Sequence, residues 1–223
     1  DPVPALFTFN SQDSRLEGIA GVSVSRVQTS VKGHKLTAEG PILVTHWGLS
    51  GPAILKLSAW GARSLYQSDY CFTLSVNWAP DHDLSQLISE QRNKHGKRSV
   101  SKRSVIESIP RRLWEKLVEA AQIDSETTWA QLNKQQITAL VEQVHTCPFE
   151  TNGKSINKDE FVTCGGVPLK EIRTKTFESK LAEGIYFAGE VLDIDGITGG
   201  FNFQHAWTTS YLASQAIADD VMA

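Results

Sequence analysis

The chain has 223 residues, of which 40% are hydrophobic and 21% charged, a composition typical of soluble globular proteins. Its 22 Lys and Arg and 25 Asp and Glu residues give a net charge of -3. Because phosphate binding needs a surplus of positive charge, this balance argues against nucleic acid as the main partner. The length suits one large domain or two small ones.

Three cysteines lie far apart and form no CxxC pair, so the sequence favours neither a zinc site nor a disulfide framework. They are Cys71, Cys147 and Cys164. Such usage is typical of a reducing cytoplasm. No apolar run is long enough to cross a bilayer and no signal segment opens the chain, so we expect a cytoplasmic protein without a membrane partner. The chain starts at Asp1 without Met, and we interpret it as a fragment.

Short alternating segments in the first third predict β-strands joined by turns. The turn signal Lys32-Gly33 separates two of them. Together they indicate a small antiparallel sheet or barrel. The predicted strands cover residues 4–9, 19–27, 35–38, 41–45 and 70–76.

Between Leu84 and His145 the hydrophobic spacing becomes helical. One helix begins near Leu84, a second after Pro110, and a third covers residues 130–144. We interpret residues 83–146 as a helical subdomain inserted in a substrate-side domain of residues 1–164.

A basic segment, residues 92–98 with Lys102 and Arg103 beyond it, lies between the first two helices. It could bind a nucleotide phosphate or nucleic acid, or it could be a solvated loop. Because no aromatic residues are interleaved with the charges, we interpret it as a solvent-exposed loop.

The last sixty residues differ again and predict part of an α/β domain, residues 165–223. Residues 160–164 are a candidate strand. Residues 184–188 are apolar on both faces, as a strand buried in a parallel sheet requires. A long helix follows from about residue 200 to 221.

A glycine-rich loop joins this strand to the helix. Thr198 is a candidate helix cap, and the N–H groups of Gly199, Gly200 and Phe201 would point forward with the positive end of the helix dipole. That arrangement attracts an anion or a carbonyl oxygen, and the missing side chains let a flat ring approach the backbone. Inside the helix, Phe203, Trp207 and Tyr211 lie one turn apart, and we expect them to pack in a core.

Metal binding is not predicted. Residues 193–196 have their glycine at the wrong spacing for a calcium loop. The side chains of Glu190, Asp193, Asp195 and His205 do not fall on one helical face.

Three blocks of the sequence resemble BaiN-like flavoproteins, also called aminoacetone-oxidase-family or NAD(FAD)-utilizing dehydrogenases. Residues 184–207 are similar to the carboxyl-terminal signature of that family. Residues 45–55 are similar to its substrate-domain motif, and residues 165–180 to the crossover back to its FAD domain. The blocks span nearly the whole chain in the expected order.

The resemblance implies an antiparallel β domain with a helical insertion, followed by the carboxyl-terminal strand, loop and helix of a two-dinucleotide-binding-type FAD domain. It also implies that the loop and helix start contact FAD. The residues concerned are Gly189, Glu190, Asp195, Thr198, Gly199, Gly200, Phe201 and Asn202.

One feature of that family is absent. No GxGxxG motif, which holds the ADP half of FAD, occurs in the sequence. We therefore expect this polypeptide alone to bind FAD weakly or not at all, and to need the amino-terminal region of the same protein as a partner.

These observations predict a fragment of an FAD-dependent oxidoreductase that moves hydride between reduced flavin, supplied by NAD(P)H, and a small organic substrate. His46 is the candidate proton relay. Two alternatives remain open: a non-catalytic interaction domain, and a metal-dependent hydrolase built on the acidic loop.

Overall fold

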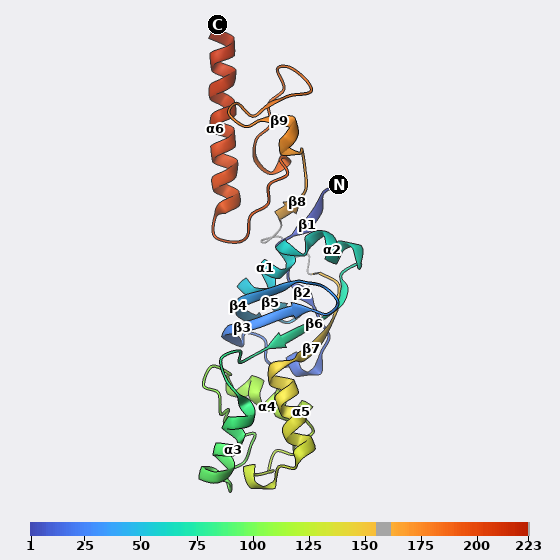
Figure 1. Cartoon of the computed structure of the whole chain (residues 1–223), viewed down its shortest axis with the longest axis vertical. Helices are drawn as coiled ribbons and strands as arrows, with labels where there is room; N and C mark the ends of the chain where they lie inside the picture. Colours follow the sequence, from blue (N-terminus) through green and yellow to red (C-terminus); the bar gives the residue numbers. More distant parts are fainter. Residues whose placement is uncertain (155–161, 223) are drawn as a thin grey trace.

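The protein is elongated and has three parts in a row (Figure 1). This computed structural model describes residues 1–154 and 162–222. A β-sheet lies in the middle, a lobe of helices at one end, and a carboxyl-terminal segment with the long helix α6 (Phe201–Met222) at the other. The predicted fold class, a mixed α and β protein with an antiparallel sheet and a helical insertion, is confirmed.

The central sheet has six antiparallel strands in the order β2-β5-β4-β3-β6-β7. Asn10 N–H in β2 donates to the Gly153 carbonyl at 3.0 Å, just beyond β7, so the two edges meet and the sheet nearly closes into a barrel. The strands are β2 (Phe9–Asn10), β3 (Ser23–Val31), β4 (Thr37–Val44), β5 (Gly48–Ser50), β6 (Cys71–Asn77) and β7 (Cys147–Asn152).

Three sets of predicted strand boundaries were wrong. The predicted strand 19–27 is observed as β3, four residues further along the chain. Residues 37–38 and 41–44, predicted as parts of two strands, belong to the single strand β4, which continues through Gly40 with φ = +146° and then packs against α1 (Pro52–Trp60). Residues 4–9 instead divide into β1 (Val3–Ala5) and β2, because Leu6 has φ = +54° and turns the backbone.

Helix α1 packs on β4 and β3 and is followed by α2 (Ala62–Gln67). Strand β1 pairs with β8 (Val162–Cys164), so Pro4 lies opposite Thr163. The candidate strand 160–164 is thus observed over its last three residues, and residues 160 and 161 lie outside the described part of the chain.

The helical lobe consists of α3 (Leu84–His95), α4 (Arg111–Ala120), α5 (Lys134–His145) and their connections, residues 84–145. Asp83 caps α3 by accepting from Gln86 N–H at 3.1 Å, and Pro110 precedes α4 as predicted. The lobe buries Trp114 and Trp129 in a core that is continuous with the core of the sheet.

The carboxyl-terminal segment has a small core of its own around Ile172, Leu192 and Ala213. It contains β9 (Ile172–Arg173), β10 (Glu178–Ser179) and the 3-10 turn η4 (Gly189–Val191) before α6. Residues 184–188 do not form the predicted buried strand and make one isolated bridge, Tyr186 to Glu178. No parallel strand runs beside them among residues 1–154 and 162–222, so nothing extends the pairing.

Arg15, in the 3-10 turn η1 (Ser14–Leu16), links the sheet to the helical lobe. Its guanidinium donates to Asp13 Oδ2 at 2.6 Å, to Gln143 Oε1 of α5 at 2.6 Å and to the Pro148 carbonyl of β7. It also lies over the Phe149 ring, 4.5 Å from the centroid. Burial alone would raise the pKa of Asp13, but the hydrogen bonds and charge of Arg15 outweigh it and lower that pKa.

Replacing Asp13 by Asn removes the charge that compensates this guanidinium. We expect the free energy of unfolding to fall by about 2 kcal/mol at neutral pH, the cost of losing a charge-assisted hydrogen-bond pair. Because folding lowers the pKa of Asp13, its stabilisation is present above the ordinary value of 3.8 and is lost as the pH falls below it. In the Asp13→Asn variant, the free energy of unfolding should therefore fall less steeply as the pH is lowered in the acid range, as measured by urea unfolding at a series of pH values.

Asp81→Asn is the matched control, since Asp81 forms an ion pair with Arg26 in which both side chains are more than half exposed. Equal losses in the two variants would contradict a special role for Asp13.

Candidate functional site

A cavity of about 440 Å³ lies where the glycine loop, residues 189–200, meets the start of α6. Ile194, Ile197 and Phe203 give it apolar walls, together with Leu6 and Leu55 from the other side. Five of the eight predicted cofactor residues line it: Glu190, Thr198, Gly199, Gly200 and Asn202.

The first turn of α6 fixes the conformation of the glycine loop. Asn202 makes a reciprocal pair with Gly196: its Oδ1 accepts from Gly196 N–H at 2.8 Å and its Nδ2 donates to the Gly196 carbonyl at 2.9 Å. Further along the helix, Thr209 Oγ1 accepts from buried Gly189 N–H at 2.9 Å. The loop is therefore held at both ends by one helix.

Gly199 and Gly200 have φ = +117° and +82°, a region that side chains rarely adopt. A Cβ on Gly200 would meet no atom within 4 Å, so its backbone faces open space. Thr198 does not cap the helix, because α6 begins three residues later at Phe201. The first N–H groups of α6 remain available to a ligand, and they favour negative charge.

Two acidic residues connect the loop to β8. Glu190 Oε1 accepts from Thr163 N–H at 2.7 Å. Burial, followed by the charge of nearby Asp195, raises the pKa of the Cys164 thiol, and burial also raises the pKa of Asp195. The other three predicted cofactor residues, Gly189, Asp195 and Phe201, do not line the cavity.

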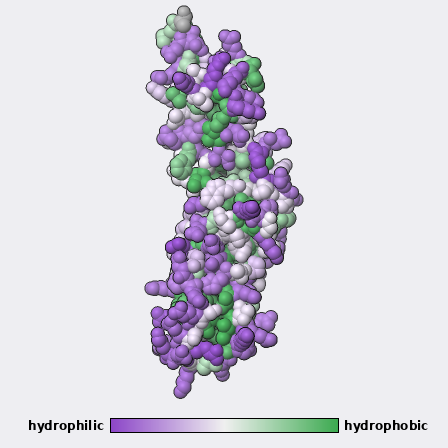
Figure 2. Space-filling view, viewed as in Figure 1, coloured by the Kyte–Doolittle hydropathy of each residue, from purple (hydrophilic) through white to green (hydrophobic). Residues whose placement is uncertain are grey.

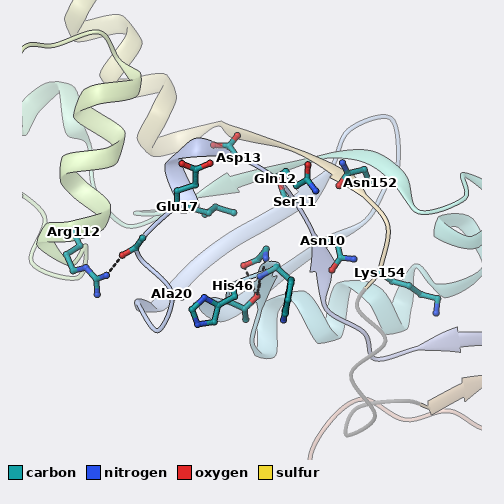
Figure 3. A pocket seen from close by; sticks show the side chains of 15 residues that line it. Asn10, Ser11, Gln12, Asp13, Glu17, Ala20, His46, Arg112, Asn152 and Lys154 are labelled. Atoms are coloured by element: carbon teal, nitrogen blue, oxygen red, sulfur yellow. Dashed lines mark hydrogen bonds between the residues drawn. The ribbon is translucent and has the colours of Figure 1, made fainter.

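His46 lines a different cavity, of about 1060 Å³, which shares no lining residue with the first. Figure 3 shows His46 and Lys154 along one side, Asp13 and Glu17 opposite, and Arg112 at one end. The amides of Asn10 and Asn152 also face it. The structure therefore separates His46 from the glycine loop, although the sequence prediction placed both at one flavin.

The turn that carries His46 is held by Gly48. A Cβ on Gly48 would lie 2.2 Å from the Phe9 carbonyl oxygen, so only glycine lets β5 approach β2 this closely. The Trp47 carbonyl accepts from Ser11 N–H at 2.9 Å. The Trp47 side chain is 64% exposed and lines the cavity. An exposed indole beside amide and cationic side chains can stack on a flat heterocycle.

The aromatic residues of α6 do not pack in a core of the described chain. Phe203, Trp207 and Tyr211 are 70%, 67% and 60% exposed, because the helix contacts the carboxyl-terminal segment through its other side. Figure 2 shows hydrophobic side chains near the lower end of α6. Exposed apolar groups of this size mark a contact surface.

Residues 1–154 and 162–222 contain no group of three or more His, Cys, Asp or Glu side chains placed to hold a metal ion. No helix in these residues has the length and apolar character needed to cross a membrane.

A nearly closed antiparallel sheet carrying a lobe of helices defines the class of protein. Residues 3–162 match the family described as HI0933-like protein barrel and H2TH domain, and the chain belongs to that family. The match covers the sheet and the helical lobe and ends at the start of β8.

Three relatives are similar to the chain over most of its length. The chain is 35% identical over 200 residues, 90% of its length, to a ribosomal RNA dihydrouridine synthase of Escherichia coli, and 31% identical over 95% of its length to the Haemophilus influenzae protein of that name. It is 29% identical over 97% of its length to a 3-dehydro-bile acid delta(4,6)-reductase of Clostridium scindens. It covers 47%, 50% and 54% of these proteins, so it spans about half of their length.

These relatives correct two predictions. The predicted small-molecule oxidoreductase was wrong, because the two relatives above 30% identity are named for modifying ribosomal RNA. The exclusion of nucleic acid as a partner was wrong for the same reason. All three relatives bear the names of enzymes, and the predicted family is confirmed at the level of the HI0933-like fold with a reductase among its relatives.

Proposed function

We propose that this chain is part of an enzyme that reduces uridine in ribosomal RNA to dihydrouridine. The observation that carries the proposal is the 35% identity to the Escherichia coli ribosomal RNA dihydrouridine synthase, which extends over 90% of the chain. The similarity includes both the sheet with its helical lobe and the carboxyl-terminal segment, so it is not confined to one common motif.

The chemistry named for the relatives has a common core. Dihydrouridine forms when the C5–C6 double bond of uracil, which is conjugated to the C4 carbonyl, gains a hydride at C6 and a proton at C5. A delta(4,6)-reductase acting on a 3-oxo steroid likewise reduces carbon–carbon double bonds conjugated to a carbonyl. One site design, a hydride source beside a proton donor, serves both substrates.

The glycine-loop cavity fits a flavin as the hydride source. Its size lies in the range of cofactor pockets, its walls are mainly apolar, and the backbone of Gly199 and Gly200 is open to a flat ring. The N–H groups at the start of α6 would stabilise negative charge on the ring edge that lies against them. A bound flavin supplies two electrons as hydride, and NAD(P)H is the reductant implied by the flavoprotein resemblance.

We propose that His46 and Trp47, on one turn, contact the RNA. His46 is not placed to relay the proton, because the cavity that it lines shares no residue with the glycine-loop cavity. The cavity at His46 is lined by Asn10 and Asn152, whose amides can pair with the edge of a base, and by the cationic side chains of Arg112 and Lys154. These features suit a nucleotide better than an apolar small molecule.

We also propose a domain boundary near residue 165. The family match ends at residue 162, and the small core around Ile172 and Leu192 is distinct from the core of the sheet and helical lobe.

Deleting the gene for this protein should abolish dihydrouridine at one or more positions of ribosomal RNA, because no other source of the reduction is expected there. Mass spectrometry of nucleosides from purified ribosomal RNA measures the loss, and the intact gene supplied in trans should restore it. Unchanged dihydrouridine in the deletion strain would refute the proposed function.

In the full-length protein that contains this chain, Gly200→Leu should lower the flavin content about tenfold, because the side chain fills the open space beside the loop. Gly184→Leu is the matched control: Gly184 has a similar φ of +77° and equally open surroundings but lies outside the cavity. Flavin absorbance per chain is the measurement, made on both variants after their melting temperatures are compared. Equal flavin content in the two variants would place the cofactor elsewhere.

His46→Ala should raise the KM for ribosomal RNA about tenfold and leave kcat within about twofold, because His46 lines a cavity apart from the glycine loop and contacts the RNA only. His34→Ala, on the exposed turn between β3 and β4, is the control and should leave both constants unchanged. Initial rates are measured over a range of concentrations of ribosomal RNA from the deletion strain. An unchanged KM for His46→Ala would exclude His46 from the RNA site.

A further inference from the structure

Positive charge is concentrated in one stretch of the helical lobe. Residues 91–106 contain six of the chain's 22 Lys and Arg residues and none of its 25 Asp and Glu residues. The net charge of -3 therefore belongs to a molecule with a strongly basic region on an acidic background. A local surplus of this kind attracts polyanions even when the whole protein repels them.

The Lys and Arg residues of the stretch are exposed, as predicted, and part of the stretch also forms the wall of a cleft. The cleft has a volume of about 610 Å³. Four of its lining residues are Lys or Arg and a fifth is His95, and no lining residue is acidic. We call this hollow the basic cleft; its cationic residues are Lys97, Arg98, Lys102 and Arg103.

The backbone of the basic cleft is held in place by residues 125–130. Ala130 N–H donates to the Gly96 carbonyl at 2.9 Å, and Trp129 N–H donates to the Arg98 carbonyl at 3.1 Å. Val100 N–H donates to the Thr127 carbonyl at 2.9 Å, and the Val100 carbonyl accepts from the buried Trp114 indole at 2.8 Å. The cations are thus carried by a framework fixed to the core of the lobe, which reduces the entropy lost on binding.

Most of these cations have no acidic neighbour. Lys102 lies 3.7 Å from Glu126, and both side chains are exposed. In the part of the chain that the structure describes, no carboxylate lies within 4.0 Å of the charged groups of Lys97, Arg98 or Arg103. Their charges are therefore available to an external anion.

We infer that the basic cleft binds the phosphodiester backbone of the RNA substrate. That the anion is RNA rests on the proposed function; the charge and shape of the cleft come from this chain alone. Several fixed cations in one hollow match successive phosphates better than a single small anion. Trp129, the aromatic residue in the wall, is only 2% exposed, so bases find no ring to stack on and the contact is to phosphate, independent of base sequence.

The cleft lies in the helical lobe, at the end of the molecule opposite α6 (Figure 1). Binding there would hold a structured RNA along the molecule while a distant nucleotide enters the reaction site. The basic cleft is then a positioning surface whose loss weakens RNA binding without altering the chemistry at the base.

The test compares two triple variants that each lose three positive charges. The cleft variant is Lys97→Gln, Arg98→Gln and Arg103→Gln. The control variant is Lys32→Gln, Lys35→Gln and Lys175→Gln, three exposed lysines outside the cleft. The probe is a fluorescein-labelled hairpin of ribosomal RNA. Fluorescence anisotropy gives the Kd at salt concentrations from 50 to 300 mM, over which the Debye length falls by about half. Matched circular dichroism and melting temperatures establish that all three proteins are folded.

We expect the cleft variant to bind at least tenfold more weakly at low salt, and its plot of log K against log salt to be shallower by about two units, because each lost phosphate contact removes roughly 0.7 to 0.9. The control variant should stay within about threefold of the unaltered protein. Bound RNA should protect Lys97 and Lys102 from reaction with an amine-specific reagent.

Equal weakening of both triple variants, or reaction of Lys97 and Lys102 that bound RNA does not slow, would overturn the inference in favour of a general charge effect. The outcome is separable from the proposed function. Cleft-dependent RNA binding with unchanged dihydrouridine in the deletion strain would refute the reaction and keep the site, whereas loss of dihydrouridine with unchanged binding by the cleft variant would do the reverse.

Discussion

The guanidinium of Arg15 is the interaction on which the arrangement of the barrel and the helical lobe depends. A partly buried cation is tolerated when its donors are satisfied, and here they reach Asp13, α5 and β7 at once. Gln143 in α5 lies 128 residues after Arg15 in the chain, and Pro148 in β7 lies 133 residues after it. Because α5 packs on α3 and α4, Arg15 and the core shared by the sheet and the lobe together hold the lobe, and with it the basic cleft, against the sheet.

The carboxyl-terminal segment is held together in a different way. Its own core is small, and its order comes from α6, which holds the glycine loop through Asn202 and Thr209. The same helix leaves Phe203, Trp207 and Tyr211 exposed on its other side. A helix that organises a loop on one face and presents aromatic rings on the other is suited to contact a further surface, in keeping with a chain that spans about half the length of its relatives.

Periodicity was enough to predict the helices of the lobe, the long carboxyl-terminal helix and the antiparallel sheet, because those elements bury one face in a regular pattern. It missed β7, because Pro148 and the charged Glu150 are unusual in a strand and occur here at the edge of the sheet. It wrongly predicted a strand over residues 184–188, which make one isolated bridge and pair with no parallel strand in the described part of the chain. The glycine loop was found from its residues, but the separation of His46 from it depends on tertiary packing. The exclusion of nucleic acid failed because net charge averages over the whole chain, whereas phosphates respond to local potential.

The central claim is that a protein built on this chain reduces a uracil ring in ribosomal RNA. The most direct measurement incubates the purified protein, a flavin and a reductant with ribosomal RNA from cells that lack its gene, and then determines the mass of each RNA fragment. The account predicts that one uridine-containing fragment gains two hydrogen atoms, and that the gain requires the reductant. Fragments of unchanged mass under conditions in which the protein binds the RNA and carries reduced flavin would contradict it.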